Sequence, residues 1–473
     1  MILRYVSTRG ETPALGFTEA MLAGLAGDGG LYVPDAWPQL PASVIAGFAG
    51  RPYAEVATEV IVRFTGDAIA RADLARAARE AYGSFRHPAV APLTQLGTNS
   101  FALELFHGPT LAFKDVAMQL LARLMDQALA ARGERRTIVV ATSGDTGGAA
   151  VEAFRDKSQV DVVVLFPRGR ISEVQRRMMT TAQAANIHAL AIDGNFDDCQ
   201  AIVKGLFNHA SFRDRVRLSG VNSINWARIV AQVVYYFTAA VALGAPARKL
   251  AFTVPTGNFG DVYAGYVAQR MGLPVDRLVI ATNVNDILTR TLATGTYELR
   301  DVVPTTSPSM DIQVASNFER LLFDAYDRDA AAIRSLMGSL GQSRRFSLSA
   351  RALSYIRAVF SADRADEDEV AATIRTVKRE TGNFVDPHTA VGIAVAEKEL
   401  RDPAVPMVVL STAHAAKFPD AVEAACGVRP QLPEWLGDLN ERPERVTVLP
   451  VDQSAVERFV LATSRAAQEG AAA

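Results

Sequence analysis

Short apolar runs alternate with helical patterns along most of the chain beyond residue 100. The runs that favour strands lie at 101–106, 137–141, 160–166, 187–192, 250–254, 278–282 and 407–410. A loop and then a helical pattern follow them, which is typical of βαβ units whose parallel sheet is buried on both faces. The pattern predicts an α/β fold of two open, mostly parallel sheet domains flanked by helices.

Two helical patterns are well defined. After Lys114, apolar residues recur at helical spacing until Gly133 ends the run, so a helix is expected to begin at Lys114, directly after a strand. The most hydrophobic run, 229–245, contains Gln232 and Thr238 and is shorter than the ~18 uninterrupted apolar residues that a membrane span requires. We therefore expect a buried helix there and no membrane association.

The chain of 473 residues exceeds the size at which single cores stop growing, so more than one domain is expected. Residues 1–95 combine helical patterns with turn signals at 27–30 and 34–41, which indicates a separate N-terminal domain. The strand-rich remainder is divided into two subdomains, at 96–220 and 221–473.

Composition narrows the class of ligand. The 49 Lys and Arg residues nearly balance the 51 Asp and Glu residues, for a formal net charge of -2. This balance removes the long-range field on which nucleic-acid or acidic-membrane binding depends. The two cysteines, Cys199 and Cys426, form no disulfide framework, and the N-terminus has no apolar segment of a secretory signal. A cytoplasmic protein that binds small molecules is expected.

Loops at the carboxyl ends of the predicted strands hold the candidate chemistry. In open α/β sheets these loops and the helix N-termini after them bind ligands. Two glycine-rich loops, ATSGDTG at 141–147 and PTGNFGD at 255–261, expose backbone N–H groups that can cradle phosphate or carboxylate. No spacing of histidine and cysteine matches a zinc site, so we expect no metal. Together the two loops and Lys114 favour a ligand with more than one acidic group.

A polar segment, SGVNSINWAR at 219–228, precedes the apolar helix. Asn222, Ser223 and Asn225 can cap the helix, with Arg228 as a surface charge. Alternatively, Asn222, Ser223 and Arg228 can clamp a phosphate, because a guanidinium supplies a fork of donors. Spacing alone leaves the two interpretations equal.

The motifs ELFHGPTLAFKD, ATSGDTG, VNSINWAR, PTGNFGD and STAHAAKF, in this order, resemble the threonine synthase family of fold-type II enzymes that depend on pyridoxal 5'-phosphate (PLP). The stretch YVSTRGE…LGF…LAGLAGDGGLYVP is similar to the additional N-terminal domain of that family. The resemblance extends from near residue 1 to about residue 425. It assigns Lys114 and the SGDTG loop to subdomain 96–220, and the phosphate loop to subdomain 221–473.

The resemblance implies roles for individual residues. Lys114 would form the Schiff base with PLP and act as the catalytic base, which requires a neutral amine. Thr412 would meet the pyridine nitrogen, and Asp145 would lie near the 3'-oxygen of PLP. The cradle for the cofactor phosphate would comprise Gly257, Asn258, Phe259, Gly260 and Asp261. The substrate carboxylate would be held by Thr142, Ser143, Gly144, Asp145 and Thr146, and the substrate phosphate by Asn222, Ser223 and Arg228.

The sequence departs from the family pattern at two positions. Asp145 stands where another branch of the family has asparagine, and an ionised carboxylate cannot donate a hydrogen bond to the 3'-oxygen. Ala415 replaces a proline that is common in the TAHPAKF version of the motif, which is expected to alter the stiffness of the loop.

The implied activity is the conversion of O-phospho-L-homoserine and water to L-threonine and phosphate, by β,γ-elimination and water addition. This is the last step of threonine biosynthesis. The alternatives on the same scaffold are a phospho-lyase that forms 2-oxobutyrate and a serine/threonine dehydratase, and a noncatalytic PLP carrier is the alternative from another class. A monomer or homodimer is expected.

Overall fold

The structure, a computed structural model, describes residues 3–399 and 402–472. Two large sheets form its framework, one with six strands in the order β13-β10-β9-β14-β4-β3 and one with five in the order β15-β7-β6-β5-β8. Every pair in these sheets is parallel except the antiparallel pair β3–β4 at one edge. The predicted α/β class with two mostly parallel sheets is therefore confirmed.

The strands of the two sheets are short and mostly buried, as the apolar runs predicted. The six-stranded sheet consists of β3 (Leu93–Gly97), β4 (Ser100–Glu104), β9 (Leu250–Pro255), β10 (Val275–Thr282), β13 (Phe360–Arg364) and β14 (Met407–Ser411). The five-stranded sheet consists of β5 (Arg136–Ala141), β6 (Val160–Pro167), β7 (Ile187–Ile192), β8 (Leu218–Ser219) and β15 (Thr447–Leu449). All seven runs predicted as strands are strands of these sheets.

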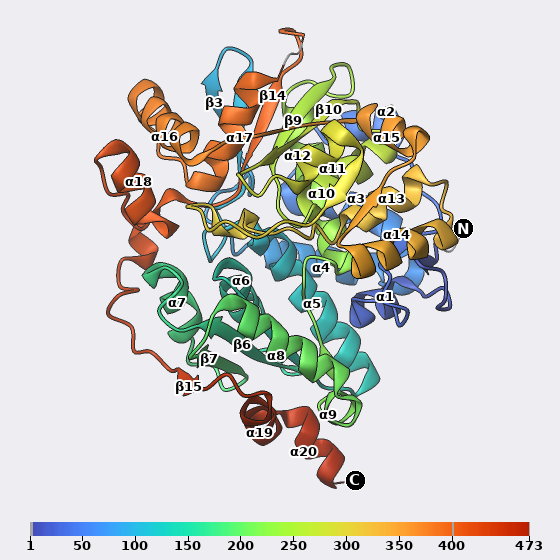
Figure 1. The fold of residues 1–473 in the computed structure, drawn as a ribbon, viewed down its shortest axis with the longest axis vertical. Helices are drawn as coiled ribbons and strands as arrows, with labels where there is room; N and C mark the ends of the chain where they lie inside the picture. The colour runs from blue at the N-terminus through green and yellow to red at the C-terminus, as the bar shows by residue number, and fades with distance from the viewer. Residues whose placement is uncertain (1–2, 400–401, 473) are drawn as a thin grey trace.

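Helices cover both faces of the two sheets (Figure 1). Between β4 and β10 they are α5 (Lys114–Arg132), α6 (Asp145–Phe154), α7 (Glu173–Thr180), α8 (Phe196–Asn208), α9 (Ala210–Arg215), α10 (Trp226–Ala242) and α11 (Gly260–Arg270). After β10 they are α12 (Ile287–Thr294), α13 (Phe318–Ala325), α14 (Ala330–Ser343), α15 (Ala350–Arg357), α16 (Glu367–Thr381), α17 (Pro387–Lys398) and α18 (Pro419–Cys426). The predicted helices at Lys114 and within 229–245 are thus confirmed as α5 and α10.

Smaller elements complete the fold. An antiparallel pair of strands, β11 (Thr296–Glu298) and β12 (Arg345–Ser347), lies outside the two sheets. Single 3-10 turns occur at η1 (Gly66–Ala68), η2 (Pro308–Met310), η3 (Ala415–Lys417) and η4 (Glu434–Leu436). Of these, η3 follows the buried strand β14, and η2 lies against Gly257 in the loop before α11.

The N-terminal region packs against the start of α10. It comprises β1 (Tyr5–Ser7), β2 (Tyr32–Pro34), α1 (Phe17–Ala23), α2 (Ala42–Ala46), α3 (Tyr53–Thr65) and α4 (Arg71–Tyr82). The buried ring of Trp226 contacts Tyr5 and Phe64 at centroid distances of 6.0 and 5.9 Å. Because Trp226 is the first residue of α10, this aromatic cluster fixes the helix end that presents Arg228.

The two sheets do not divide the chain at residue 220. Strand β4 precedes that residue but belongs to the six-stranded sheet, and β15 follows it but belongs to the five-stranded sheet. Figure 1 shows the chain after α18 passing from one half of the molecule to the other before β15. The boundaries 1–95, 96–220 and 221–473 remain predictions, and each large sheet draws strands from both sides of residue 220.

The C-terminal segment packs against the rest of the chain as two helices. It forms α19 (Gln453–Thr463) and α20 (Arg465–Ala472) against the five-stranded sheet. Arg465 binds the buried Asp161 of β6 through its Nε, 2.6 Å from Oδ1, and its backbone N–H donates to Oδ2 at 2.7 Å. This ion pair anchors the end of the chain, and local composition gave no sign of it because its two members are far apart in sequence.

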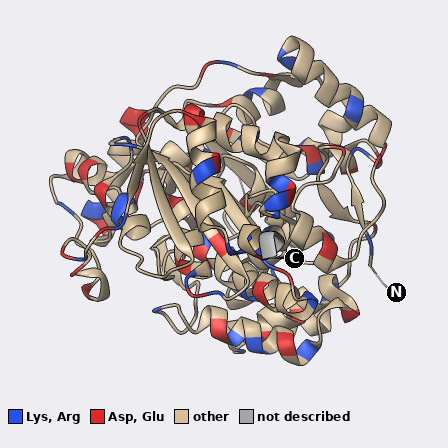
Figure 2. Ribbon diagram, turned by 90° about the horizontal axis from the view of Figure 1, so that it is seen from below, with Lys and Arg blue, Asp and Glu red and all other residues tan. Residues whose placement is uncertain are grey.

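Acidic and basic residues are interspersed along the elements (Figure 2). None of the described helices is long and apolar enough to cross a membrane.

Candidate active site

Four loops at carboxyl ends of strands lie close to Lys114. Lys114 is the first residue of α5, and the N–H of the preceding Phe113 donates to the carbonyl of Thr412 at 2.8 Å. Thr412 follows β14, and its own N–H donates to the Thr389 hydroxyl at 3.3 Å. The ends of β4 and β14 are therefore joined directly, and Thr412, which is 6% exposed, is buried beside the lysine.

Lys114 faces the start of α6 across the space between the two sheets. Its Nζ donates to Oδ2 of Asp145 at 3.2 Å. Burial lowers the pKa of Lys114, the negative charge of Asp145 opposes this change, and the positive charges of Lys417 and Arg228 reinforce it. Burial is thus the main cause of the lowered pKa of Lys114.

Asp145 is the centre of a charged network. Its Oδ1 accepts from Lys417 Nζ at 2.7 Å and from Gln175 Nε2 at 2.9 Å. Burial by itself would raise the pKa of Asp145, but Lys417 and Lys114 hold it well below its usual range. Asp145 is therefore held as a carboxylate, and it acts only as an acceptor.

The loop before α6 is held in one conformation by its own side chains. The Thr142 hydroxyl accepts from the N–H groups of Gly144 and Gly147, both at 2.9 Å. Gly144 has φ 134°, and a Cβ there would lie 2.4 Å from the Gln175 side chain. Thr142 is buried and supports the loop, whereas Ser143 and Thr146 are half-buried at the start of α6.

The second glycine loop forms the start of α11. Phe259 has φ 65°, and a Cβ at Gly257 would lie 2.7 Å from the Ser309 carbonyl oxygen of η2. Asn258 is exposed, and its carbonyl accepts from Asn317 Nδ2 at 3.0 Å. The first N–H groups of a helix have no partner within it, so this turn presents donors to an anion at Gly260.

Asp261 lies buried in the first turn of α11. The hydroxyls of Tyr235 and Tyr236 both donate to its Oδ1, whereas Oδ2 has no partner among the described residues. Burial raises the pKa of Asp261 to about 7, although the two tyrosines and Lys114 oppose this rise. The carboxyl group therefore titrates near neutral pH, which sequence reasoning did not predict.

The segment before α10 contains a helix cap, as one interpretation predicted, and a buried arginine. Asn225 caps the helix, since its side chain accepts from Ala227 N–H at 3.0 Å and donates to the Met21 carbonyl at 2.8 Å. Arg228, in contrast, is 2% exposed and is not a surface charge. Asn222 is exposed and Ser223 is half-buried.

Arg228 is a buried cation with few protein partners. Its Nη1 donates to the Val221 carbonyl at 3.1 Å, and its buried Nε has no partner in the part of the chain that the structure describes. Burial lowers the pKa of Arg228 to about 10. A guanidinium held in this way has donors available for an anion.

Three residues of the site were not among the candidates from the sequence: Gln175, Asn317 and Lys417. Lys417 lies within the STAHAAKF motif. A lysine in a 3-10 turn is expected at the surface, but the side chain of Lys417 is only 1% exposed. Gln175 and Asn317 have no local signal, because they reach the site from α7 and from the residue before α13.

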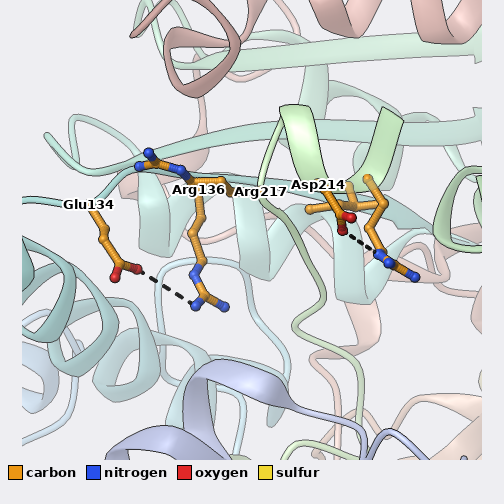
Figure 3. Close-up of a pocket in the computed structure, with 6 residues that line it drawn as sticks. Glu134, Arg136, Asp214 and Arg217 are labelled. Carbon is orange, nitrogen blue, oxygen red and sulfur yellow. Dashed lines mark hydrogen bonds and ion pairs between the residues drawn. The ribbon is translucent and has the colours of Figure 1, made fainter. Parts of the chain in front are cut away.

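Other parts of the molecule do not add a second centre of this kind. No group of three or more potential ligands for a metal ion occurs among the described residues. A surface hollow lined by Glu134, Arg136, Arg213, Asp214, Arg217 and Leu218 lies at the amino end of β5, opposite the end that precedes α6 (Figure 3). Its charges are paired, with Arg213 Nε 2.9 Å from Asp214 Oδ1.

Family comparisons cover most of the chain. Residues 4–82 match the family described as "Threonine synthase N terminus", residues 86–335 match "Pyridoxal-phosphate dependent enzyme", and residues 389–460 match "Threonine synthase, C-terminal". The chain is 52% identical over 459 residues to threonine synthase of Pseudomonas aeruginosa, covering 97% of this chain and 98% of that protein. It is 41% identical to threonine synthase of Methylobacillus glycogenes, covering 97% and 99%.

Solved structures agree with these matches. The PLP-bound threonine synthase from Brucella melitensis superposes with a TM-score of 0.96 at 62% identity, over 98% of this chain and 100% of that chain. Yeast threonine synthase superposes with a TM-score of 0.93 at 36% identity, over 97% and 98%. These matches confirm the predicted fold-type II architecture, its N-terminal domain and the cofactor. The chain, with its buried lysine between two glycine-rich loops, belongs to the threonine synthase family of pyridoxal-phosphate-dependent enzymes.

Proposed function

We propose that the chain converts O-phospho-L-homoserine and water to L-threonine and phosphate, with Lys114 as the catalytic base. The observation that carries this proposal is the placement of one buried amine among three groups suited to anions. These are the SGDT turn before α6, the start of α11, and the partly unpartnered guanidinium of Arg228. The cofactor phosphate, the substrate carboxylate and the substrate phosphate are the three anions to be held.

The residues present fit PLP. A Schiff base needs a lysine that loses its proton readily, and burial lowers the pKa of Lys114. The start of α11, where no side chain fits at Gly257, would hold the cofactor phosphate with Asn258, Phe259, Gly260 and Asp261. Thr412 offers a hydroxyl for the pyridine nitrogen. When bound, PLP supplies the electron sink that lets a proton leave the α-carbon of an amino acid.

Lys114 has the central role in proton transfer. The reaction requires that protons leave Cα and Cβ, that phosphate leaves Cγ, that water adds at Cβ, and that protons return to Cγ and Cα. Nζ of Lys114 is a buried base placed for these transfers, because the pKa of Asp145 lies well below its usual range and its carboxylate is therefore a weak base. We assign the proton at Cα to Lys114 in both directions.

The remaining predicted residues orient the substrate. Ser143, Gly144 and Thr146 would bind its carboxylate through the turn that Thr142 holds in place. Arg228, with Asn222 and Ser223 from the preceding loop, would bind its phosphate. A buried guanidinium favours a phosphorylated substrate, which supports the synthase over a serine/threonine dehydratase.

Two further properties belong to this proposal. The two cysteines, Cys199 and Cys426, are free, which is consistent with a reducing compartment such as the cytoplasm. We propose a monomer or homodimer, and light scattering of the purified chain will distinguish the two.

Product analysis tests the reaction. The PLP-loaded protein is incubated with O-phospho-L-homoserine, and the products are identified by NMR. Threonine and phosphate in equal amounts are expected. Formation of 2-oxobutyrate instead would reassign the chain as a phospho-lyase, and no turnover would favour a noncatalytic PLP carrier.

The Lys114→Ala variant tests the assignment of the lysine. It is expected to bind PLP noncovalently, and borohydride reduction will leave no cofactor on the chain. In the wild-type protein, reduction followed by peptide mapping will place the cofactor on Lys114. Covalent trapping in the variant would assign the Schiff base to another lysine.

A further inference from the structure

Asp145 lies between the amino groups of two buried lysines, and only one of them has a role in the proposed reaction. Lys114 Nζ is 3.2 Å from Oδ2, whereas Lys417 Nζ is 2.7 Å from Oδ1. The side chain of Lys417 is 1% exposed, so bulk water does not screen its charge. A buried lysine that the reaction does not use requires a physical reason.

Lys417 is held in place independently of Lys114. Its Nζ also donates to the carbonyl oxygen of Thr110 at 2.8 Å, in the loop that leads into α5. The turn η3 that presents Lys417 follows β14 of the six-stranded sheet, whereas Asp145 follows β5 of the five-stranded sheet. Lys417 therefore bridges the two halves of the site and brings a fixed positive charge to the carboxylate.

The charges around Lys114 come from four elements. Asp145 of α6 favours the protonated ammonium form of Lys114, and Lys417 of η3 and Arg228 of α10 disfavour it. Asp261 of α11 also lies within electrostatic range of Lys114. Without Lys417, the charge of Asp145 would be paired by Lys114 alone, and the lysine would be held as an ammonium ion that cannot attack a carbonyl.

Two other titratable groups lie near Lys417, and neither competes with Asp145 for the ion pair. Asp115 of α5 is within electrostatic range of Lys417, but its carboxylate accepts from the N–H and the hydroxyl of Thr110, both at 2.7 Å. Burial lowers the pKa of His414 to about 4, so this ring is neutral at neutral pH. Neither group replaces Asp145 as the ion-pair partner of Lys417.

We propose that Lys417 is a positioning residue that serves as the counter-ion of Asp145, and thereby leaves Lys114 as a neutral amine. This inference rests on the proposed role of Lys114 as the reactive amine. It also explains how an aspartate can stand at position 145. The charges of Asp145 and Lys417 cancel, so this pair does not favour the protonated form of Lys114. An asparagine at 145 would need no such counter-ion.

The protonation of Lys114 can be measured without turnover. The full-length chain, freed of PLP, is acetylated with trace acetic anhydride from about pH 6 to about pH 11, since only neutral amines react, and the Lys114 peptide is quantified by mass spectrometry. Lys417→Met is expected to raise the apparent pKa of Lys114 by about 1 to 2, which slows acetylation near neutral pH about ten- to a hundredfold. Lys398→Met, which removes an exposed ammonium beside Glu369, is the matched control and will leave the profile unchanged.

A double variant separates charge from packing. Lys417→Met combined with Asp145→Asn removes both members of the pair, so the pKa of Lys114 is expected to return to the wild-type value or below it. Lys417→Arg, which keeps the charge, is expected to retain the wild-type profile. An unchanged profile in Lys417→Met, or a double variant that fails to reverse the rise, would overturn the proposal.

If Lys417→Met does not fold, the Asp145→Asn variant alone still tests the proposal. This nearly isosteric change is expected to lower the apparent pKa of Lys114 and speed its acetylation near neutral pH, and a slower reaction would contradict the proposal. Failure of the proposed function would give a different result from failure of the counter-ion role, because borohydride would then trap PLP on another lysine. Trapping on Lys114 together with an unchanged profile in Lys417→Met would refute the counter-ion role alone.

Discussion

The Arg228→Met substitution tests whether the buried cation of Arg228 binds a ligand or stabilises the fold. The Arg228 side chain is buried in the first turn of α10, and among the described residues its hydrogen bond runs from Nη1 to the Val221 carbonyl at 3.1 Å. Methionine has a similar length and no charge, so it can fill the same space. The substitution therefore removes the anion-binding group with little change in packing.

The expected change in the free energy of unfolding follows from the cost of burying the charge of Arg228. Burial lowers the pKa of Arg228 from 12.5 to about 10, and each pKa unit corresponds to about 1.4 kcal/mol, so burying the charge costs about 3 kcal/mol. One hydrogen bond from a charged donor returns about 1.5 to 3 kcal/mol. In the absence of ligand, Arg228 thus contributes no stability, and the variant is expected to be as stable as the wild type or up to about 2 kcal/mol more stable.

The assay combines unfolding with kinetics. Denaturant unfolding of the ligand-free proteins gives the free energies of unfolding, and inorganic phosphate is expected to stabilise the wild type and not the variant. The loss of a charge-assisted contact of about 1.5 to 3 kcal/mol to the substrate phosphate lowers kcat/KM about ten- to more than a hundredfold.

Arg320 provides the matched control. It is also fully buried, and burial also lowers its pKa to about 10. Its guanidinium, however, is bound by the carbonyls of Tyr32 and Ile224 and by the side chain of Asn317. Arg320→Met leaves buried acceptors unsatisfied and is expected to destabilise the chain by about 3 kcal/mol or more. An equal loss of stability in Arg228→Met would refute the assignment of Arg228 to ligand binding.

Two further predictions concern the ends of α6 and α11. Gly144→Ala places a Cβ at φ 134° and 2.4 Å from the Gln175 side chain, so KM is expected to rise at least about tenfold, whereas Gly148→Ala, with 3.7 Å of space, will be close to wild type in steady-state kinetics. Asp261 has a pKa raised to about 7 in the folded chain, so its contribution to stability is present below about pH 4 and is lost as the pH rises to about 7. In the PLP-free protein, Asp261→Asn is therefore expected to gain stability relative to the wild type over this interval, and a gain that is independent of pH in denaturant titrations would contradict the raised pKa.

The framework of the fold was predictable because buried parallel strands are continuous apolar runs. All seven predicted runs are strands of the two large sheets, with ends that differ by a few residues. The strands of these two sheets that were missed are β3, β8, β13 and β15, which lie at sheet edges and are short or partly exposed. An edge strand pairs with a neighbouring strand on one side and faces solvent on the other, so its composition does not distinguish it from a loop.

The loops of the candidate site were predictable from chain order, but their contacts were not. Lys114 and the two glycine loops follow predicted strands, and this placement brings them to one end of the sheets. The contact between Lys417 and Asp145 joins residues on different sheets, and no local spacing encodes it. Likewise, the burial of Arg228 depends on the aromatic cluster around Trp226, which is built from the N-terminal region.

The path of the chain between the two large sheets has a consequence for assembly of the enzyme. Within the described residues the chain crosses from one sheet to the other after β4, after β8 and after β14. The six-stranded sheet can be completed only after β14 has been synthesised, and the five-stranded sheet only after β15 has been synthesised and has added to β7. Separate expression of two halves cut near residue 220 would give fragments that each lack strands of their own sheet, so the active site can form only by complementation between the fragments.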